Sequence, residues 1–214
     1  CGMCDVLHSL NAKTGAINWK VDFVERYDTP LPAFGMVCSP LIDGDDLYRQ
    51  LPANCQIWRN FSHPRLMIDC RVRSFPIGPR DLFLVKDELM GGIRSSKRTL
   101  PWAFMGTLWA SGSRTIAVSH FLRSLPHGFF YGGKSFGIGL PLEQYRQRLM
   151  QSVFALAPEG DRHLDTFRLW ESLCCGCIPL VVEHHASAEA LLGHDAPVPV
   201  FEAWPHALDF AQQQ

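Results

Sequence analysis

Residues 152–182 read SVFALAPEGDRHLDTFRLWESLCCGCIPLVV, and this stretch decides the fold. Its outer segments, 152–158 and 177–182, are short apolar runs of the kind found in strands that are buried on both faces. Between them, Asp165 is expected to cap a helix that stops at Gly176. The apolar residues expected to share one face of this helix are Phe167, Trp170, Leu173 and Cys174. A strand, a helix and a second strand in this order predict a parallel β-α-β unit.

The same alternation extends over residues 97–214. The expected strands are 100–106 and 198–201, and residues 128–139 are expected to form a Gly-rich loop. One helix is expected from Ser113, as its N-cap, to about Leu125, and another begins with Pro141 as its first helical residue. Two further helices are expected over 186–192 and from Trp204 to the end. This pattern predicts an α/β domain with a Rossmann-like parallel sheet. Ligands of such sheets bind outside the carboxyl ends of the strands, where the loop 158–165 is expected.

The first fifty residues follow a different pattern. Residues 6–22 alternate apolar and polar side chains around Lys13-Thr14-Gly15, which predicts a β-hairpin with Gly15 in the turn. Residues 39–48 predict two further strands around an Asp-Gly turn, so 1–50 is expected to form a β-meander. Residues 51–96 carry prolines at 52, 64, 76 and 79 and are expected to connect two bodies, with a strand or two.

Composition narrows the class of protein. The chain has 214 residues, of which 47% are hydrophobic and 19% charged, so it can bury a core and is no disordered tail. Its formal net charge is −1, which implies no nucleic-acid partner, although residues 49–98 hold 10 basic and 4 acidic groups. No apolar run reaches the roughly 18 residues of a membrane span. The chain begins at Cys1 rather than Met, so we expect it to be part of something longer.

The eight cysteines are too sparse for a disulfide scaffold. The pair Cys1 and Cys4 has zinc-ligand spacing but no second pair at a suitable distance. Three more, Cys174, Cys175 and Cys177, lie in an apolar stretch, where small buried residues are expected rather than metal ligands. We therefore expect no metal site.

Two stretches of the sequence resemble known protein families. The run FALAPEGDRHLDTFRLWESLCCGCIPLVV, with PVPVFEAWPHALDF after it, resembles exostosin-like glycosyltransferases, in which a strand ending in Pro-x-Gly precedes Asp-Thr-x-Arg-x-Trp-Glu-x-Leu and Gly-Cys-Ile-Pro. This resemblance covers about residues 60–214. The run LNAKTGAINWKVDF, with SPLIDGDDLY after it, resembles a single blade, residues 5–48, of the β-propellers built from pyrroloquinoline-quinone repeats. A propeller needs several blades to close, so one blade is not expected to hold a quinone.

The glycosyltransferase resemblance implies the GT-B arrangement of two facing Rossmann-like halves. Residues 97–214 would be the C-terminal half, which holds the nucleotide-diphosphate sugar, and 51–96 a possible remnant of the half that holds the glycan acceptor. The expected reaction is transfer of a sugar to a glycan hydroxyl, with no cofactor or metal required and with activity of this chain alone left open. Two alternatives stand beside it: a non-catalytic nucleotide-binding or structural fragment, and part of a quinoprotein-like propeller. A Golgi lumen location would follow if the parent were a eukaryotic membrane-anchored protein.

Six residues are candidates for the donor site. The resemblance implies that Glu171 hydrogen-bonds the donor ribose, the alternative being a surface carboxylate. Arg168, in the first helical turn, could clamp a diphosphate at the helix N-terminus or pair with Asp165. Asp165 and Thr166 are expected to cap the helix beside the ligand.

The remaining two candidates flank that helix along the chain. Gly160 would allow close backbone approach to the ligand. Arg114 is similar to a basic residue of the family and is a candidate phosphate contact. No catalytic base can be named, and His163, His184 and His185 are expected near the site by topology alone.

Overall fold

The structure is a computed structural model that describes residues 6–11, 13–22, 25–26, 53, 56–59, 70–84, 93–108, 112–133, 139–160, 163–183, 188–195 and 197–214. The chain divides into two compact units, residues 1–55 and 56–214. The predicted strands at 39–48, the Cys1–Cys4 pair and the His184–His185 pair lie outside the described residues. In the described part of the chain, no helix combines the length and apolar character needed to cross a bilayer.

The first unit contains the predicted hairpin. Strand β1 (Val6–Leu10) pairs antiparallel with β2 (Ile17–Asp22). Between them, the Oδ1 atom of Asn11 accepts the backbone N–H groups of Lys13 and Thr14, and Gly15 adopts a φ of 72°. This positive φ favours glycine, because other residues meet a steric penalty there. The sequence-based prediction of a turn at 13–15 is confirmed.

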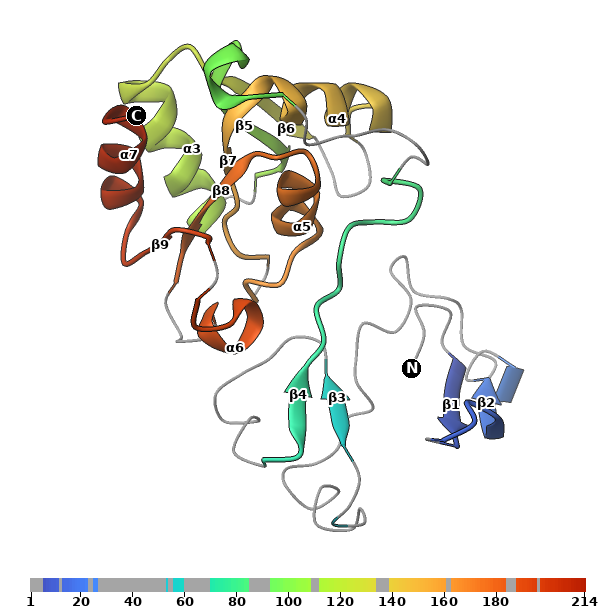
Figure 1. Ribbon diagram of the computed structural model, residues 1–214. Helices are drawn as coiled ribbons and strands as arrows, with labels where there is room; N and C mark the ends of the chain where they lie inside the picture. Colours follow the sequence, from blue (N-terminus) through green and yellow to red (C-terminus); the bar gives the residue numbers. More distant parts are fainter. Residues whose placement is uncertain are drawn as a thin grey trace. The chain divides into compact units, whose positions relative to one another are not determined.

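A five-stranded parallel sheet organises the second unit (Figure 1). Its strands are β5 (Leu100–Thr107), β6 (Phe129–Gly133), β7 (Ser152–Leu156), β8 (Ile178–Val182) and β9 (Val200–Phe201), in the spatial order β6-β5-β7-β8-β9. All four pairings are parallel. The chain first crosses from β5 to β6 on one side and then returns to place β7 on the other side of β5. The α/β class with a Rossmann-like parallel sheet is therefore confirmed.

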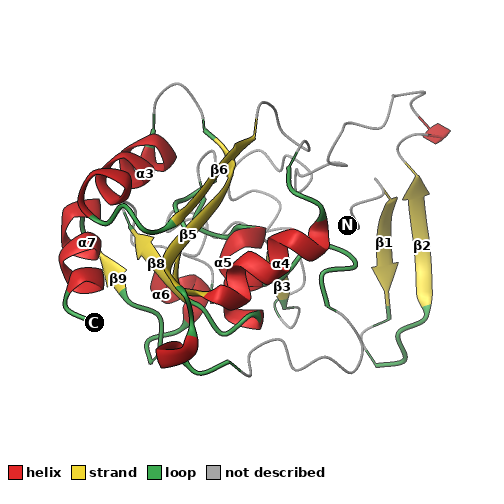
Figure 2. Cartoon of the chain, turned by 90° about the horizontal axis from the view of Figure 1, so that it is seen from above, coloured by secondary structure: helices red, strands yellow, loops and turns green. Residues whose placement is uncertain are grey.

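Helices cover both faces of this sheet (Figures 1 and 2). Helices α3 (Ser113–Ser124) and α7 (Trp204–Gln212) lie on one face, and α4 (Leu142–Gln151) and α5 (Phe167–Cys174) on the other. The short α6 (Ala188–Leu192) precedes β9, and a 3₁₀ turn, η2 (Ser95–Lys97), precedes β5.

The strands alternate their side chains between the two faces, as a buried parallel sheet requires. Trp102 and Phe104 of β5 pack toward α3 and α7, while Ala103 and Met105 of the same strand pack toward α4. Trp102 also donates its Nε1–H to the carbonyl of Leu125 at 2.6 Å. The core on both faces fixes the strand ends, and with them the residues at the carboxyl edge of the sheet.

Three local predictions were wrong. The expected loop 128–139 contains β6, because Phe129, Phe130 and Tyr131 favour a strand and pair with β5 at the sheet edge. Helix α3 has Gly112 at its N-cap, and α4 has Pro141 there, so each predicted start is displaced by one residue.

The buried face of α5 also differs from the prediction. The structure buries Leu169, Glu171 and Ser172, while Leu173 is 36% exposed. Hydrophobic spacing alone selected the wrong face, because the helix buries the carboxylate of Glu171 against the partly exposed Arg80. The predicted end of α5 is confirmed: Gly176 has a φ of 67° and donates its N–H to Leu173, while Cys177 donates to Ser172, which is a Schellman motif.

A second pair of strands precedes the sheet along the chain. Strand β3 (Ile57–Arg59) pairs in parallel with β4 (Val72–Ser74). Residues 75–84, which we call the strap, follow β4 and contact the α/β sheet through α5 and α4. The strap holds the side chains that shape the candidate site.

Candidate functional site

The candidate site lies at the carboxyl edge of the sheet, between the ends of β5 and β7. Ligands of open parallel sheets bind where the strand order reverses, which in this sheet is at these two neighbouring strands. Arg114, in the first turn of α3, donates Nη1–H to the carbonyl of Thr107 at 3.1 Å and Nε–H to that of Glu159 at 3.5 Å. The residue is 9% exposed. Its guanidinium therefore lies at the reversal point and joins the two strand ends.

A second guanidinium, that of Arg168, reaches the same edge from α5. It stacks on the ring of Phe104, with 4.6 Å between the guanidinium carbon and the ring centroid. Its Nε and Nη1 atoms are buried and have no hydrogen-bond partner among the described residues. Burial lowers the pKa of Arg168 from its ordinary value, because desolvation disfavours the charged guanidinium. A buried donor of this kind costs free energy until an acceptor binds it.

Gly106 at the end of β5 makes room for this guanidinium. A Cβ atom built at this position would lie 2.6 Å from Nη2 of Arg168, which is closer than real Cβ contacts allow. Any larger residue at 106 would have to displace the Arg168 head group. The sequence did not single out this glycine, because its role depends on a side chain that is distant in sequence.

The start of α5 corrects one sequence prediction. Thr166 is the N-cap, and its Oγ1 accepts the N–H of Leu169 at 3.4 Å. Asp165 is buried and does not cap the helix. Its Oδ2 accepts the N–H of Ile77 at 3.1 Å, and its Oδ1 accepts the Nε1–H of Trp170 at 2.7 Å. The carboxylate of Asp165 therefore anchors the strap to α5.

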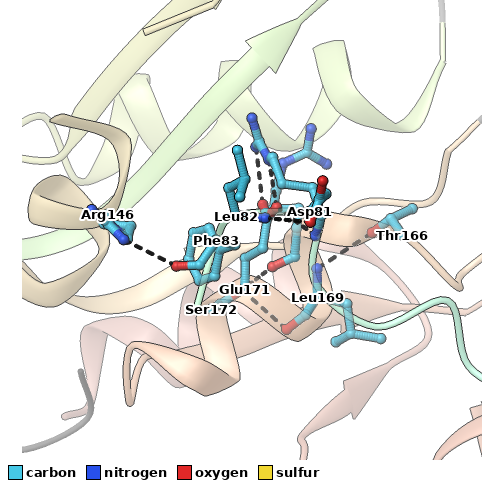
Figure 3. Close-up of polar contacts among 10 residues, drawn as sticks. Asp81, Leu82, Phe83, Arg146, Thr166, Leu169, Glu171 and Ser172 are labelled. Carbon is cyan, nitrogen blue, oxygen red and sulfur yellow. Dashed lines mark hydrogen bonds and ion pairs between the residues drawn. The ribbon is translucent and has the colours of Figure 1, made fainter. Parts of the chain in front are cut away.

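Glu171 lies under the same strap and is fully buried. Arg80 donates Nε–H to its Oε1 at 2.6 Å and Nη2–H to its Oε2 at 3.0 Å, and the backbone N–H of Arg80 contacts Oε1 at 3.3 Å. Figure 3 shows Glu171 close to the strap residues Asp81 and Leu82. Glu171 is thus no surface carboxylate. Both of its oxygens are occupied by Arg80, and its expected contact with a donor ribose stays a prediction.

Two aromatic residues complete the surroundings of this ion pair. The Arg80 guanidinium carbon lies 4.6 Å from the ring centroid of Tyr145 in α4. Burial and the negative charge of Glu171 raise the pKa of the Tyr145 hydroxyl well above its ordinary value, so the phenol stays neutral. Phe83 is fully buried, and its carbonyl accepts Nη1–H of Arg146 at 3.2 Å (Figure 3). The strap is therefore held at both carboxylates and at Phe83.

Gly160 lies in the loop between β7 and α5. A Cβ atom there would meet only ordinary contacts, at 3.5 Å from Cγ2 of Thr166 and 3.6 Å from the carbonyl of His163. The packing of the protein itself therefore does not require glycine at this position, and its close approach to a ligand stays a prediction. His163 is half-buried in the described part of the same loop.

The predicted burial is confirmed for two of the three clustered cysteines, while Cys174 is only half-buried. Cys175 and Cys177 are buried, and burial raises the pKa of each thiol to about 12. The thiol of Cys177 lies 2.8 Å from the carbonyl of Leu149. Among the described residues, no group of three or more His, Cys, Asp or Glu side chains is arranged to hold a metal ion.

The structure brings five of the six candidates to one edge of the sheet: Arg114, Gly160, Asp165, Thr166 and Arg168. The residue that sequence reasoning missed is Arg80. Its partner, Glu171, lies 91 positions away, and no local pattern reveals the pair. No protein-family model matches the chain, and the search of curated proteins gives no match either.

Proposed function

We propose that residues 97–214 bind a nucleotide-diphosphate sugar at the carboxyl edge of the sheet and act as the donor half of a GT-B-type, exostosin-like glycosyltransferase. The observation that carries this proposal is the guanidinium of Arg168, whose buried Nε and Nη1 atoms have no partner among the described residues. A buried cation is costly unless an anion compensates it, and a diphosphate offers several charged oxygens to a planar guanidinium.

Three further features support an anionic ligand at this place. Arg168 is in the first turn of α5, where the positive end of the helix dipole also favours negative charge. Arg114 adds a second positive charge at the strand-order reversal. Gly106 leaves the Arg168 head group in place instead of displacing it. Together they would stabilise the charge that develops on a departing nucleoside diphosphate.

A hollow further along the same edge would suit the neutral part of the ligand. A hollow of about 210 Å³ lies beyond the end of β8. It is lined by Glu183, Glu189 and His194 among others, beside apolar Leu192 and Val198. Carboxylates beside apolar side chains would suit the hydroxyls and ring faces of a nucleoside. A second hollow, of about 230 Å³, lies along the exposed side of α3 and is lined by residues of that one helix, so we assign it no role.

Calorimetric titration with UDP, GDP and inorganic pyrophosphate tests the proposal. The full chain should bind at least one of the nucleotides, and Arg168→Ala should weaken that binding. Arg123→Ala is the matched control, because it removes the same charge from the exposed last turn of α3. The proposal fails if no nucleotide binds, or if both variants lose the same affinity, as general electrostatic attraction would produce.

A donor-hydrolysis assay on the same protein then separates the two remaining functions. Release of free sugar from a nucleotide sugar supports a glycosyltransferase. Binding without hydrolysis supports a non-catalytic nucleotide-binding unit. The acceptor proton must also pass to a base, and none of the residues described above is assigned to that step.

A further inference from the structure

Two residues of α5 have the spacing of an ion pair, but no hydrogen bond joins Glu171 to the buried Nε and Nη1 atoms of Arg168. Arg168 and Glu171 are three positions apart on this helix, a spacing at which oppositely charged side chains are neighbours. Glu171 instead gives both oxygens to Arg80, and Nε and Nη1 of Arg168 have no partner in the described part of the chain. Glu171 therefore pairs with Arg80, which is 91 positions away in the sequence, and not with its helix neighbour Arg168.

The geometry of the Arg80–Glu171 pair explains how the competition is decided. Arg80 approaches with its Nε and Nη2 atoms side by side, which is the two-bond arrangement that matches a carboxylate best. Its backbone N–H adds a third contact to the same carboxylate. A helix neighbour such as Arg168 offers no comparable backbone contact, so Arg80 is the stronger partner.

The nearest alternative counterion on the helix is engaged as well. Asp165 accepts one hydrogen bond from the strap, at Ile77, and one from Trp170. The strap thus contacts both carboxylates that flank Arg168 along the chain. Among the described residues, this arrangement leaves the buried Nε and Nη1 atoms of Arg168 without a hydrogen-bond acceptor at the edge where a ligand would bind.

We propose that Arg80 is a positioning residue for anion binding: by holding the carboxylate of Glu171, it prevents an Arg168–Glu171 ion pair and keeps Arg168 available to a phosphorylated ligand. Arg80 itself makes no contact with that ligand. The inference rests on the proposed function, because it assumes that a diphosphate binds at Arg168.

Titration of the full chain with pyrophosphate and UDP tests the inference. If it is correct, a second substitution, at Glu171, should restore the affinity that a substitution of Arg80 removes, which a purely structural role of Arg80 would not produce. In Arg80→Ala the released Glu171 can pair with Arg168, so affinity should fall about tenfold or more, within the usual range of coupling between linked groups. In the double variant Arg80→Ala/Glu171→Gln the neutral amide cannot neutralise Arg168. Its affinity for pyrophosphate should return to within about threefold of the wild-type value, the remainder reflecting imperfect additivity.

Glu171→Gln alone provides a second measurement if Arg80→Ala does not fold. It should bind pyrophosphate, which has no ribose for residue 171 to contact, as tightly as the wild-type protein does, since Gln removes the competing charge. Melting curves of all variants show which of them are folded at the temperature of the titration.

The outcomes separate this inference from the proposed function. A double variant as weak as Arg80→Ala would show that Arg80 contacts the ligand directly and would overturn the inference alone. Unchanged binding by Arg80→Ala, or weak binding of pyrophosphate by a folded Glu171→Gln protein, would overturn it too. If the wild-type protein binds neither UDP nor GDP, or if Arg168→Ala binds as well as wild type, the proposed function itself fails.

Discussion

Replacing Glu171 by Ala should destabilise the second unit, because the side chain is fully buried and receives three N–H groups of Arg80. Removing one member of a buried ion pair costs about 3–5 kcal/mol when its partner remains unsolvated. The Arg80 side chain is 41% exposed, so water can solvate its guanidinium after the substitution. We therefore expect a loss of about 2–3 kcal/mol in the free energy of unfolding.

For a protein of this length, each kcal/mol lowers the melting temperature by about 2–4 °C, so Glu171→Ala should melt roughly 5–10 °C below the wild type. Differential scanning calorimetry measures this shift, and urea unfolding gives the free energy independently. Glu143→Ala is the matched control, since it removes an exposed carboxylate from α4. Surface substitutions of that kind usually change stability by less than about 0.5 kcal/mol.

The loss should be smaller for Glu171→Gln, which still offers an amide oxygen to Arg80 at the same position. An unchanged melting temperature for Glu171→Ala would refute the reasoning. It would show that the Arg80 pair contributes nothing to stability, and that Glu171 remains free to serve a ligand such as a ribose. Equal losses for Glu171→Ala and Glu143→Ala would refute it as well.

Two further predictions concern the core. Gly128→Ala would place a Cβ atom 2.0 Å from Cε2 of the fully buried Trp102, so overpacking should lower the free energy of unfolding by about 3 kcal/mol or more. Gly160→Ala is the control and should be nearly neutral, because its Cβ would meet only ordinary contacts. Equal unfolding midpoints of the two variants in urea would contradict this prediction. Because burial raises the pKa of Cys177 to about 12, the native thiol should react with iodoacetamide far more slowly than the exposed thiol of Cys70. Mass spectrometry measures the two alkylation rates, and similar rates would exclude the buried placement of Cys177. The same shift favours the protonated thiol in the folded state, so its stabilising effect should be complete below about pH 9 and be lost as pH rises toward 12, which urea unfolding at several pH values can follow.

Local signals were sufficient for much of the fold. The unbroken apolar runs at 152–156 and 178–182 predicted buried parallel strands, because such strands have no polar face to show. Gly176 marked the end of α5 and Gly15 the hairpin turn, since each has the positive φ that glycine adopts without penalty. Strand β6 was missed, because the glycines at its end and beyond it concealed an aromatic edge strand.

The candidate site was predictable only as a region. The order of strands and helices placed the loop before α5 at the carboxyl edge of the sheet, together with Arg168 and Arg114. The partners of those side chains were not predictable. Gly106 leaves room for Arg168, and Arg80 binds Glu171, through contacts between residues far apart in the chain.

The sequence by itself therefore determined the α/β class, the order of its elements and the residues that lie at the edge of the sheet, because periodicity and turn chemistry act between near neighbours. The pairing of the charged side chains depends on the tertiary structure. By spacing, Glu171 could have been exposed, bound to a ligand or paired with Arg168. The fold brings Arg80 to it on the strap, and a fork of hydrogen bonds to a buried carboxylate is stronger than a neighbour contact along one helix.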